Sequence, residues 1–219
     1  MKKYKLTTET LQFAGRTLHR IKAVKDFDSI KAGEFGGWIE NEKNLSQDDN
    51  AWIYGNAMVF DNAMVFYNAK VYGNAKVYDN ANVSDYAEVY GNAEVYDYAN
   101  VFGNAEVYDN ANVSDYAKVY GNAVIKGDAK VHDAVGYIVF KNFWSSGRYF
   151  TWTSSNNKWS VGCFYGTSEE LIKKAYADSE KSGREYERVV RYVESILADE
   201  KKDEQLKESI SLCFSDNVR

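Results

Sequence analysis

Histidine is the side chain best suited to proton transfer near neutral pH, and this chain has two, His19 and His132. Either could act as a general base if a substrate lay against it. His132, however, stands at an outward position of a regular repeat where tyrosine or phenylalanine is usual, and His19 lies outside that repeat. We therefore favour two surface histidines and expect no catalytic residue.

Other patterns that mark an enzyme or a metal centre do not occur in the sequence. There is no phosphate-binding glycine loop, GxGxxG, CxxC, HExxH or GxSxG motif. The two cysteines, Cys163 and Cys213, fit small buried apolar side chains better than a redox pair. The sequence predicts that the chain is not an enzyme and that it binds no cofactor and no metal ion.

Aspartates recur at a constant spacing and could form a column of carboxylates. Stacked carboxylates about 4.8 Å apart repel one another, so a bound cation is one interpretation. The interpretation that we favour is that each aspartate accepts a backbone amide at a tight corner, as in an Asx turn. The residues concerned are Asp61, Asp79, Asp97, Asp115 and Asp133.

Tyrosine is unusually common, with 18 in the chain, and many of these residues also recur at a constant spacing. Exposed rings in a flat row can stack on bases or sugars or bind a protein, but they can equally cover one another and stiffen the fold. Acidic residues beside them would steer a basic partner. The candidate binding residues are Tyr54, Tyr72, Tyr90 and Tyr108 in one row, Tyr78 and Tyr96 in another, and Glu88, Glu94 and Glu106 beside them.

A second candidate binding surface lies nearer the C-terminus, where Trp144, Arg148, Trp152 and Trp159 occur close together. An arginine among tryptophans is typical of an energetic hot spot in a protein interface. A small hydrophobic core with an arginine at its edge explains the same residues, and the sequence does not separate the two.

A six-residue repeat positions most of these residues and runs without interruption from Ala51 to Ala134. All fourteen units begin with alanine and have valine or isoleucine third, as in AKVYGN and AEVYDN. The first and third side chains share one side of a short strand and form an interior, whereas the second and fourth point outward. Glycine, aspartate and asparagine at the fifth and sixth places suit tight corners. The pattern predicts a parallel β-helix in which, with three units in each coil, residues eighteen apart stack.

An aliphatic residue followed four places later by a small one resembles the hexapeptide-repeat proteins; Ile53 to Ala57 and Val59 to Ala63 both match. The resemblance implies a left-handed β-helix with three flat faces. Acyltransferases of this kind use a histidine as general base, often at a trimer interface, and a loop that projects from a coil. Because the fourteen units contain no such loop, we expect no acyltransferase activity.

The flanking segments do not follow the hexad. Residues 1–50 predict a β cap that protects the open edge of the first coil, with a hairpin turn near Gly15. Residues 135–219 predict a small α+β module of three strands followed by helices, with a break at Gly183. The expected fold is mainly β: a left-handed parallel β-helix, residues 51–134, with a small C-terminal α+β domain. The first C-terminal helix begins at a capping box formed by Thr167 and Glu170, and Leu206 and Ile210 suggest a short third helix.

The segments GGWIE…NLSQ and WSSGRYFTWT…WSVGCFYGTSEELIKKAY resemble uncharacterised proteins of phages and prophages of Gram-positive bacteria. Residues 51–134 contain eleven acidic residues and five lysines, so the predicted β-helix is acidic. These features predict a non-catalytic binding protein that inhibits or sequesters a host macromolecule, for example an anti-CRISPR protein that occupies a basic groove. A structural scaffold is the alternative.

The expected partner is a host protein or nucleoprotein, because a net charge of -5 disfavours nonspecific binding to nucleic acid. A dimer is the expected assembly, since two-fold pairing is the commonest arrangement of identical chains. No apolar run approaches the ~18 residues of a membrane span, and the N-terminus lacks the apolar core of a signal peptide. We expect a cytoplasmic protein of a bacterial cell.

Overall fold

The computed structural model describes residues 2–144 and 147–215. The chain divides into two compact units, Met1–Tyr165 and Gly166–Arg219, which are described separately here. The first unit contains the β-helix with a β-structure at each end, and the second contains two helices. The architecture is therefore mainly β with a small helical part, as the sequence predicts.

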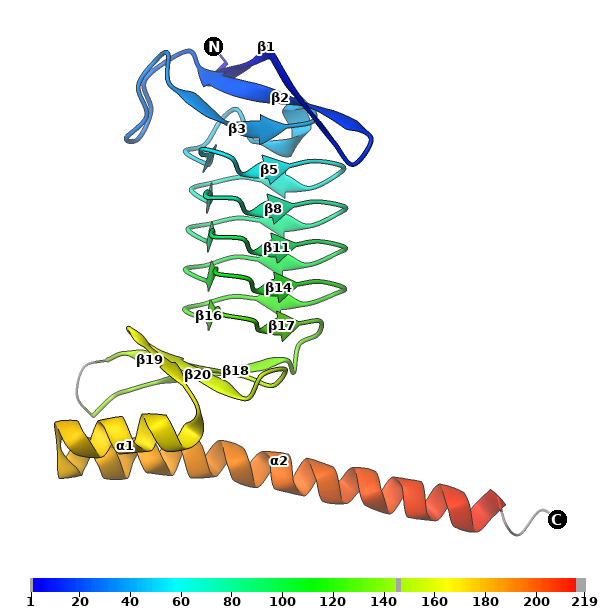
Figure 1. Ribbon diagram of the computed structural model, residues 1–219, viewed down its shortest axis with the longest axis vertical. Helices are drawn as coiled ribbons and strands as arrows, with labels where there is room; N and C mark the ends of the chain where they lie inside the picture. The colour runs from blue at the N-terminus through cyan, green and yellow to red at the C-terminus, as the bar shows by residue number, and fades with distance from the viewer. Residues whose placement is uncertain (1, 145–146, 216–219) are drawn as a thin grey trace. The chain divides into compact units, whose positions relative to one another are not determined.

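The repeats form a parallel β-helix (Figure 1), with one two-residue strand from the second and third places of each hexad. Successive strands join three sheets in turn, so each strand pairs with strands three hexads away. We call these sheets the first face (β4, β7, β10, β13, β16), the second face (β5, β8, β11, β14, β17) and the third face (β6, β9, β12, β15). The strands are β4 (Trp52–Ile53), β5 (Met58–Val59), β6 (Met64–Val65), β7 (Lys70–Val71), β8 (Lys76–Val77), β9 (Asn82–Val83), β10 (Glu88–Val89), β11 (Glu94–Val95), β12 (Asn100–Val101), β13 (Glu106–Val107), β14 (Asn112–Val113), β15 (Lys118–Val119), β16 (Val124–Ile125) and β17 (Lys130–Val131).

The register confirms the eighteen-residue coil. Glu88 pairs with Lys70 on one side and with Glu106 on the other, and Val89 pairs with Val71 in the same way. The alanines at the first place and the valines and isoleucines at the third place of all fourteen hexads have no exposed surface. The interior is therefore two kinds of apolar column, whose burial supplies the driving force for coiling.

A three-stranded antiparallel structure, β1 (Tyr4–Phe13), β2 (Arg16–Ala23) and β3 (Phe35–Ile39), continues the second face at its N-terminal end. The hairpin between β1 and β2 turns at Gly15, which has a φ of 79°, as the sequence predicts. β3 pairs in parallel with β5, and a short 3-10 helix, Glu42–Asn44, follows it. This end of the second face is thus continued by strands of the N-terminal segment.

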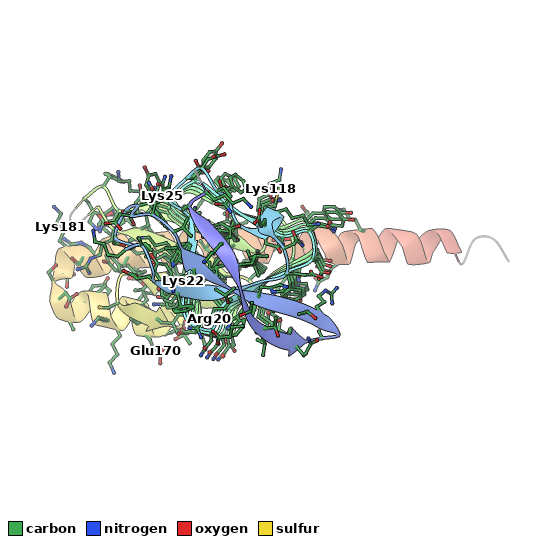
Figure 2. The ribbon with its side chains drawn as sticks, turned by 90° about the horizontal axis from the view of Figure 1, so that it is seen from above. Arg20, Lys22, Lys25, Lys118, Glu170 and Lys181 are labelled. Atoms are coloured by element: carbon green, nitrogen blue, oxygen red, sulfur yellow. The ribbon has the colours of Figure 1, made fainter. Side chains whose placement is uncertain are left out.

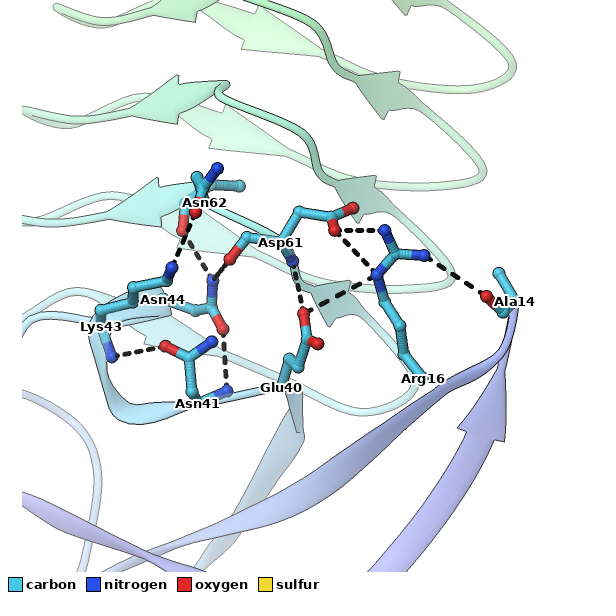
Figure 3. Close-up of polar contacts among 9 residues, drawn as sticks. Ala14, Arg16, Glu40, Asn41, Lys43, Asn44, Asp61 and Asn62 are labelled. Carbon is cyan, nitrogen blue, oxygen red and sulfur yellow. Dashed lines mark hydrogen bonds and ion pairs between the residues drawn. The ribbon is translucent and has the colours of Figure 1, made fainter.

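Polar side chains satisfy the backbone where the first coil has no coil before it. The Lys3 ammonium donates to the carbonyls of Asp49 and Ala51 at 2.7 and 2.9 Å, and burial lowers the pKa of Lys3 to about 8. The Asn44 amide donates to two further carbonyls, those of Asp61 and Ala63 (Figure 3). In the same view Arg16 pairs with the Asp61 carboxylate. Buried polar groups at the edge are thereby hydrogen-bonded.

An antiparallel sheet follows the last coil and consists of β18 (Tyr137–Lys141), β19 (Tyr149–Thr153), β20 (Lys158–Val161) and β21 (Phe164–Gly166), which ends at the boundary of the two units. Three of its hydroxyl groups accept the backbone amides that the last strand of each face would otherwise leave open. The pairs are the Tyr120 amide with the Tyr137 hydroxyl at 3.3 Å, the Val124 amide with the Thr151 hydroxyl at 3.0 Å, and the Lys130 amide with the Ser155 hydroxyl at 2.7 Å.

The second unit consists of α1 (Ser168–Asp178) and α2 (Glu180–Ser215). The capping box of Thr167 and Glu170 is present as predicted. The break falls at Ser179 and not at Gly183, which lies inside α2 where a Cβ would be 2.2 Å from the Tyr176 ring. Glycine at this position therefore allows the two helices to approach closely rather than ending one. The predicted third helix is also wrong, because α2 runs unbroken through this segment. Among the described residues, no helix combines the length and apolarity that a membrane crossing requires.

Candidate functional site

The tyrosines of the first face form one row, as their spacing predicts. The ring centroids of Tyr72 and Tyr90 are 4.6 Å apart and those of Tyr90 and Tyr108 are 4.5 Å apart, with nearly parallel planes. Tyr54 meets Tyr72 edge-on. The row ends at Lys126, whose ammonium lies 5.5 Å from the Tyr108 centroid, a cation–π contact. Each inner ring is thus covered by its neighbours.

In the two tyrosine rows, three hydroxyl groups donate to glutamates of the following coil, each sixteen residues further along the chain. On the second face, Tyr78 stacks on Tyr96 at 5.0 Å, and Lys76 pairs with Glu94 at 2.7 Å. The sequence-based candidates are therefore brought together in pairs that their equal spacing alone did not reveal. The hydroxyl contacts are Tyr72 with Glu88 at 2.7 Å, Tyr78 with Glu94 at 3.1 Å and Tyr90 with Glu106 at 2.9 Å.

These contacts favour the neutral phenols. Partial burial, followed by the hydrogen bond to Glu106, raises the pKa of Tyr90, and burial with the nearby Glu106 charge raises the pKa of Tyr108 to about 12. Tyr72 and Tyr78 have raised pKa values for the same two kinds of reason. The rows are half-buried and internally hydrogen-bonded, and their role in binding a partner stays a prediction.

Two of the column aspartates accept backbone amides in different ways: Asp133 accepts the Val135 amide two residues on at 3.0 Å, as an Asx turn does, whereas Asp97 accepts an amide of the next coil. Asp97 accepts the amide of Asp115 at 3.3 Å, one coil further on, and Asp85 accepts that of Gly103 at 3.0 Å. Asp61, with a φ of 57°, has the left-handed backbone that such a corner requires. The carboxylates thus link adjacent coils.

The tryptophans near the C-terminus divide between core and surface. Trp152 and Trp159 are directly paired across β19 and β20, and both are buried. Trp144 is half-buried with its ring 6.0 Å from Phe150, and Arg148 is exposed. Two of the four candidates therefore belong to the core of the small sheet, and a role of the group in binding stays a prediction.

The third face presents the exposed aromatic rings that sequence reasoning missed. Tyr120, at a fourth place of this face, is 55% exposed. Tyr116, which is 74% exposed, stands at the sixth place of a second-face hexad, at the corner that leads to this face, and stacks on Tyr98. The available signal was the position of Tyr120 in the last hexad of its face, because no third-face strand follows it.

His132 is held by two side chains at the end of the second face. Its Nδ1 lies 2.6 Å from the Ser114 hydroxyl and 3.3 Å from the Asp115 carboxylate, and Ser114 also donates to Asp115 at 3.2 Å. Both side chains contact the same ring nitrogen, so a proton on Nδ1 would be donated to one or the other of them. Ser114 is buried, whereas His132 is 51% exposed on its side chain. The two contacts orient the imidazole ring.

Ala134, two residues after His132 in the chain, is one of the residues that line a cavity of about 500 Å³. It lies between the last strand of the third face and the sheet that follows the coils. Figure 2, which looks along the β-helix, shows Lys118 of this strand projecting outward from the coils. The lining consists of Lys118, Tyr120, Gly121, Asn122, Ala134, Tyr137, Val139 and Tyr149.

Comparisons with known proteins give one informative relative. A comparison with protein families finds no match. The chain is 39% identical over 62 residues to an uncharacterised acetyltransferase of Escherichia coli K12, YdcK, a match that covers 25% of this chain and 19% of that protein. The chain therefore spans about a fifth of the length of the curated relative that it matches.

This similarity contradicts two predictions made from the sequence. The chain was expected not to be an enzyme, and to act as a phage-encoded inhibitor of a host macromolecule; the relative is named as an acetyltransferase. The comparisons support neither a phage origin nor an anti-defence role. The sequence analysis also treated His132 as an isolated residue of its column, whereas Ser114, in the same column one coil earlier, and Asp115 contact its ring.

Proposed function

We propose that the chain is an acyltransferase in which His132 is the general base. The observation that carries the proposal is the contact of the His132 Nδ1 with Ser114 and Asp115, on a hexapeptide β-helix similar over part of its length to a protein named as an acetyltransferase. A carboxylate and a hydroxyl on one ring nitrogen fix the tautomer and stabilise the imidazolium that forms when the other nitrogen is protonated.

The reaction would transfer an acyl group from a thioester such as acetyl-coenzyme A to a hydroxyl or amine. Nε2 of His132 takes the acceptor proton as the acceptor attacks the thioester carbonyl. The tetrahedral intermediate then collapses, the C–S bond breaks, and the departing thiolate receives the proton from the imidazolium. In the acyltransferases that this repeat resembles, the histidine often lies between copies of the chain, and the exposure of His132 leaves room for such a neighbour.

The test is release of free thiol from acetyl-coenzyme A, together with calorimetric binding of the thioester. His132→Gln should lower turnover by about 10²- to 10⁴-fold, the usual loss for a general base, and leave thioester binding within about twofold. His19→Gln is the matched control and should keep full activity. Asp115→Asn should lower turnover less than His132→Gln does, because the Asp115 carboxylate orients the histidine ring but does not itself take the acceptor proton. A protein that neither binds nor turns over acetyl-coenzyme A, or a His132→Gln variant with full turnover, would refute the proposal.

A further inference from the structure

The aromatic column of the third face ends differently from those of the other two faces. Phe102 and Tyr120 stack with centroids 5.3 Å apart and planes within 11°. On the first face the column ends at Lys126, and on the second face Ser114 and His132 follow the last ring, Tyr96. The coil ends with β17 of the second face, so no third-face strand follows β15. Phe102 covers one side of the Tyr120 ring, and Tyr120 also lines the cavity.

The cavity offers flat rings and hydrogen-bonding groups. Its lining includes Tyr120, which directly follows β15, Tyr137 of β18 and Tyr149 of β19, and Val139 adds an apolar wall. The Tyr137 hydroxyl is already committed, because it donates to the Lys118 carbonyl at 3.0 Å and accepts from the Tyr120 amide. This contact fixes the ring of Tyr137 at the edge of the last coil. The Asn122 side chain supplies a neutral donor and acceptor.

The charge of the site is positive. Lys118 lines the cavity, and the Lys141 ammonium lies 5.7 Å from the ring centroid of Tyr149, another lining residue. None of the described lining residues is acidic. On an otherwise acidic chain, this is a local site for an anion with a flat ring.

We propose that this cavity binds a purine nucleotide, with the base stacked on Tyr120 and a phosphate paired with Lys118. A base would extend the Phe102–Tyr120 stack by one more ring, and stacking on aromatic side chains is the commonest way in which proteins hold a base without reading its sequence. The cavity is within the size range of small-ligand sites, about 300–1,000 Å³. The proposal does not depend on acyl transfer, since it requires neither His132 nor a thioester.

The experiment is isothermal titration of the full chain with adenosine 5′-monophosphate, with adenosine 3′,5′-bisphosphate, which is the nucleotide end of coenzyme A, and with inorganic phosphate. Binding of either nucleotide with no comparable binding of phosphate supports the site. The two nucleotides distinguish the source: preference for the bisphosphate identifies the acyl donor, and preference for the monophosphate a free nucleotide.

Two variants and a control locate the binding. Tyr120→Leu should weaken nucleotide affinity by about 5- to 100-fold, the range expected for one lost base stack. Lys118→Gln should weaken it about tenfold and reduce its dependence on salt. Lys130→Gln, which removes an exposed lysine of the second face, should leave it unchanged. His132→Gln should also leave it unchanged, so a failure of the proposed acyl transfer is separable from a failure here. Absence of nucleotide binding, or equal affinity in folded Tyr120→Leu and Lys118→Gln proteins, overturns the inference.

Discussion

The first and third faces of the β-helix are built on the same hexad but present different surfaces. On the first face, Tyr90 is stacked on both sides and its hydroxyl donates to Glu106. On the third face, Tyr120 is 55% exposed, and no carboxylate stands at the second place of that face's hexads. The interior columns of alanine and valine are the same on both.

On the first face, a glutamate one coil further on accepts the hydroxyl of the ring, as Glu106 accepts from Tyr90, and the next ring stacks on it. On the third face, Tyr120 stands on the last strand, so no residue one coil further on can accept its hydroxyl. A single template therefore yields one self-satisfied face and one that is open to contacts.

The largest expected effect comes from the feature that the two faces share. Val89→Asp places an unpaired charge in the interior under the first face and should destabilise the protein by roughly 4 kcal/mol or more. Met64→Asp, an outward position of the third face, should change stability by no more than about 0.5 kcal/mol. Urea denaturation followed by circular dichroism measures both. Equal midpoints for Val89→Asp and the unmodified protein would show that the valines are not interior.

A smaller effect should separate the two faces directly. Tyr90→Ala removes two stacking contacts and a hydrogen bond and should cost about 2–3 kcal/mol, whereas Tyr120→Ala on the third face removes one stack from a ring that is more than half exposed and should cost less than about 1 kcal/mol. Denaturation midpoints of the two variants give the comparison. Equal losses would mean that the glutamate contact adds nothing to the first face.

The smallest effect is a dependence on alkaline pH. The pKa of Tyr108 is about 12 in the folded protein against 10.0 for a free phenol, because of burial and the nearby glutamate. The folded form thus keeps a proton that the unfolded form loses, so this stabilisation is complete below pH 10 and is lost as the pH rises through the folded value. Stability should fall between pH 10 and 12, and less steeply in Tyr108→Phe. Tyr116→Phe, which changes an exposed ring at a corner outside the first face, serves as the control. The unfolding midpoint and the ultraviolet absorbance of tyrosinate follow the change, and a pH profile that Tyr108→Phe leaves unaltered would contradict the assignment.

Much of the β-helix could be read from the order of residues. Alanine and valine two places apart lie on one side of a strand whatever the rest of the chain does, and fourteen uninterrupted units leave the coil no alternative period. The stacks of Tyr72 on Tyr90 and of Tyr78 on Tyr96 followed from the eighteen-residue coil. The helices were predicted less well, because the role of Gly183 depends on how closely Tyr176 of the neighbouring helix packs.

The candidate site was predicted only in part. His132 is recognisable from the sequence as a possible base. Ser114 lies eighteen residues before it and therefore stacks beside it in the eighteen-residue coil, but the sequence analysis considered this stacking for aromatic rings and not for hydroxyl groups. The contact with Asp115 requires a particular side-chain direction at a corner, which a spacing does not specify. The cavity could not be predicted, since three of its eight lining residues, Tyr137, Val139 and Tyr149, come from strands outside the repeat.

The coil, its register and its interior follow from the order of the residues, because every unit repeats the same local period. The way in which the coil ends is visible only in the folded chain. Tyr137, Thr151 and Ser155 lie in a segment without the hexad, and their hydroxyl groups accept the amides left open by the last strands. Such contacts join residues far apart in the chain, and they depend on side-chain rotamers and on how a separate sheet packs, neither of which a period of six encodes.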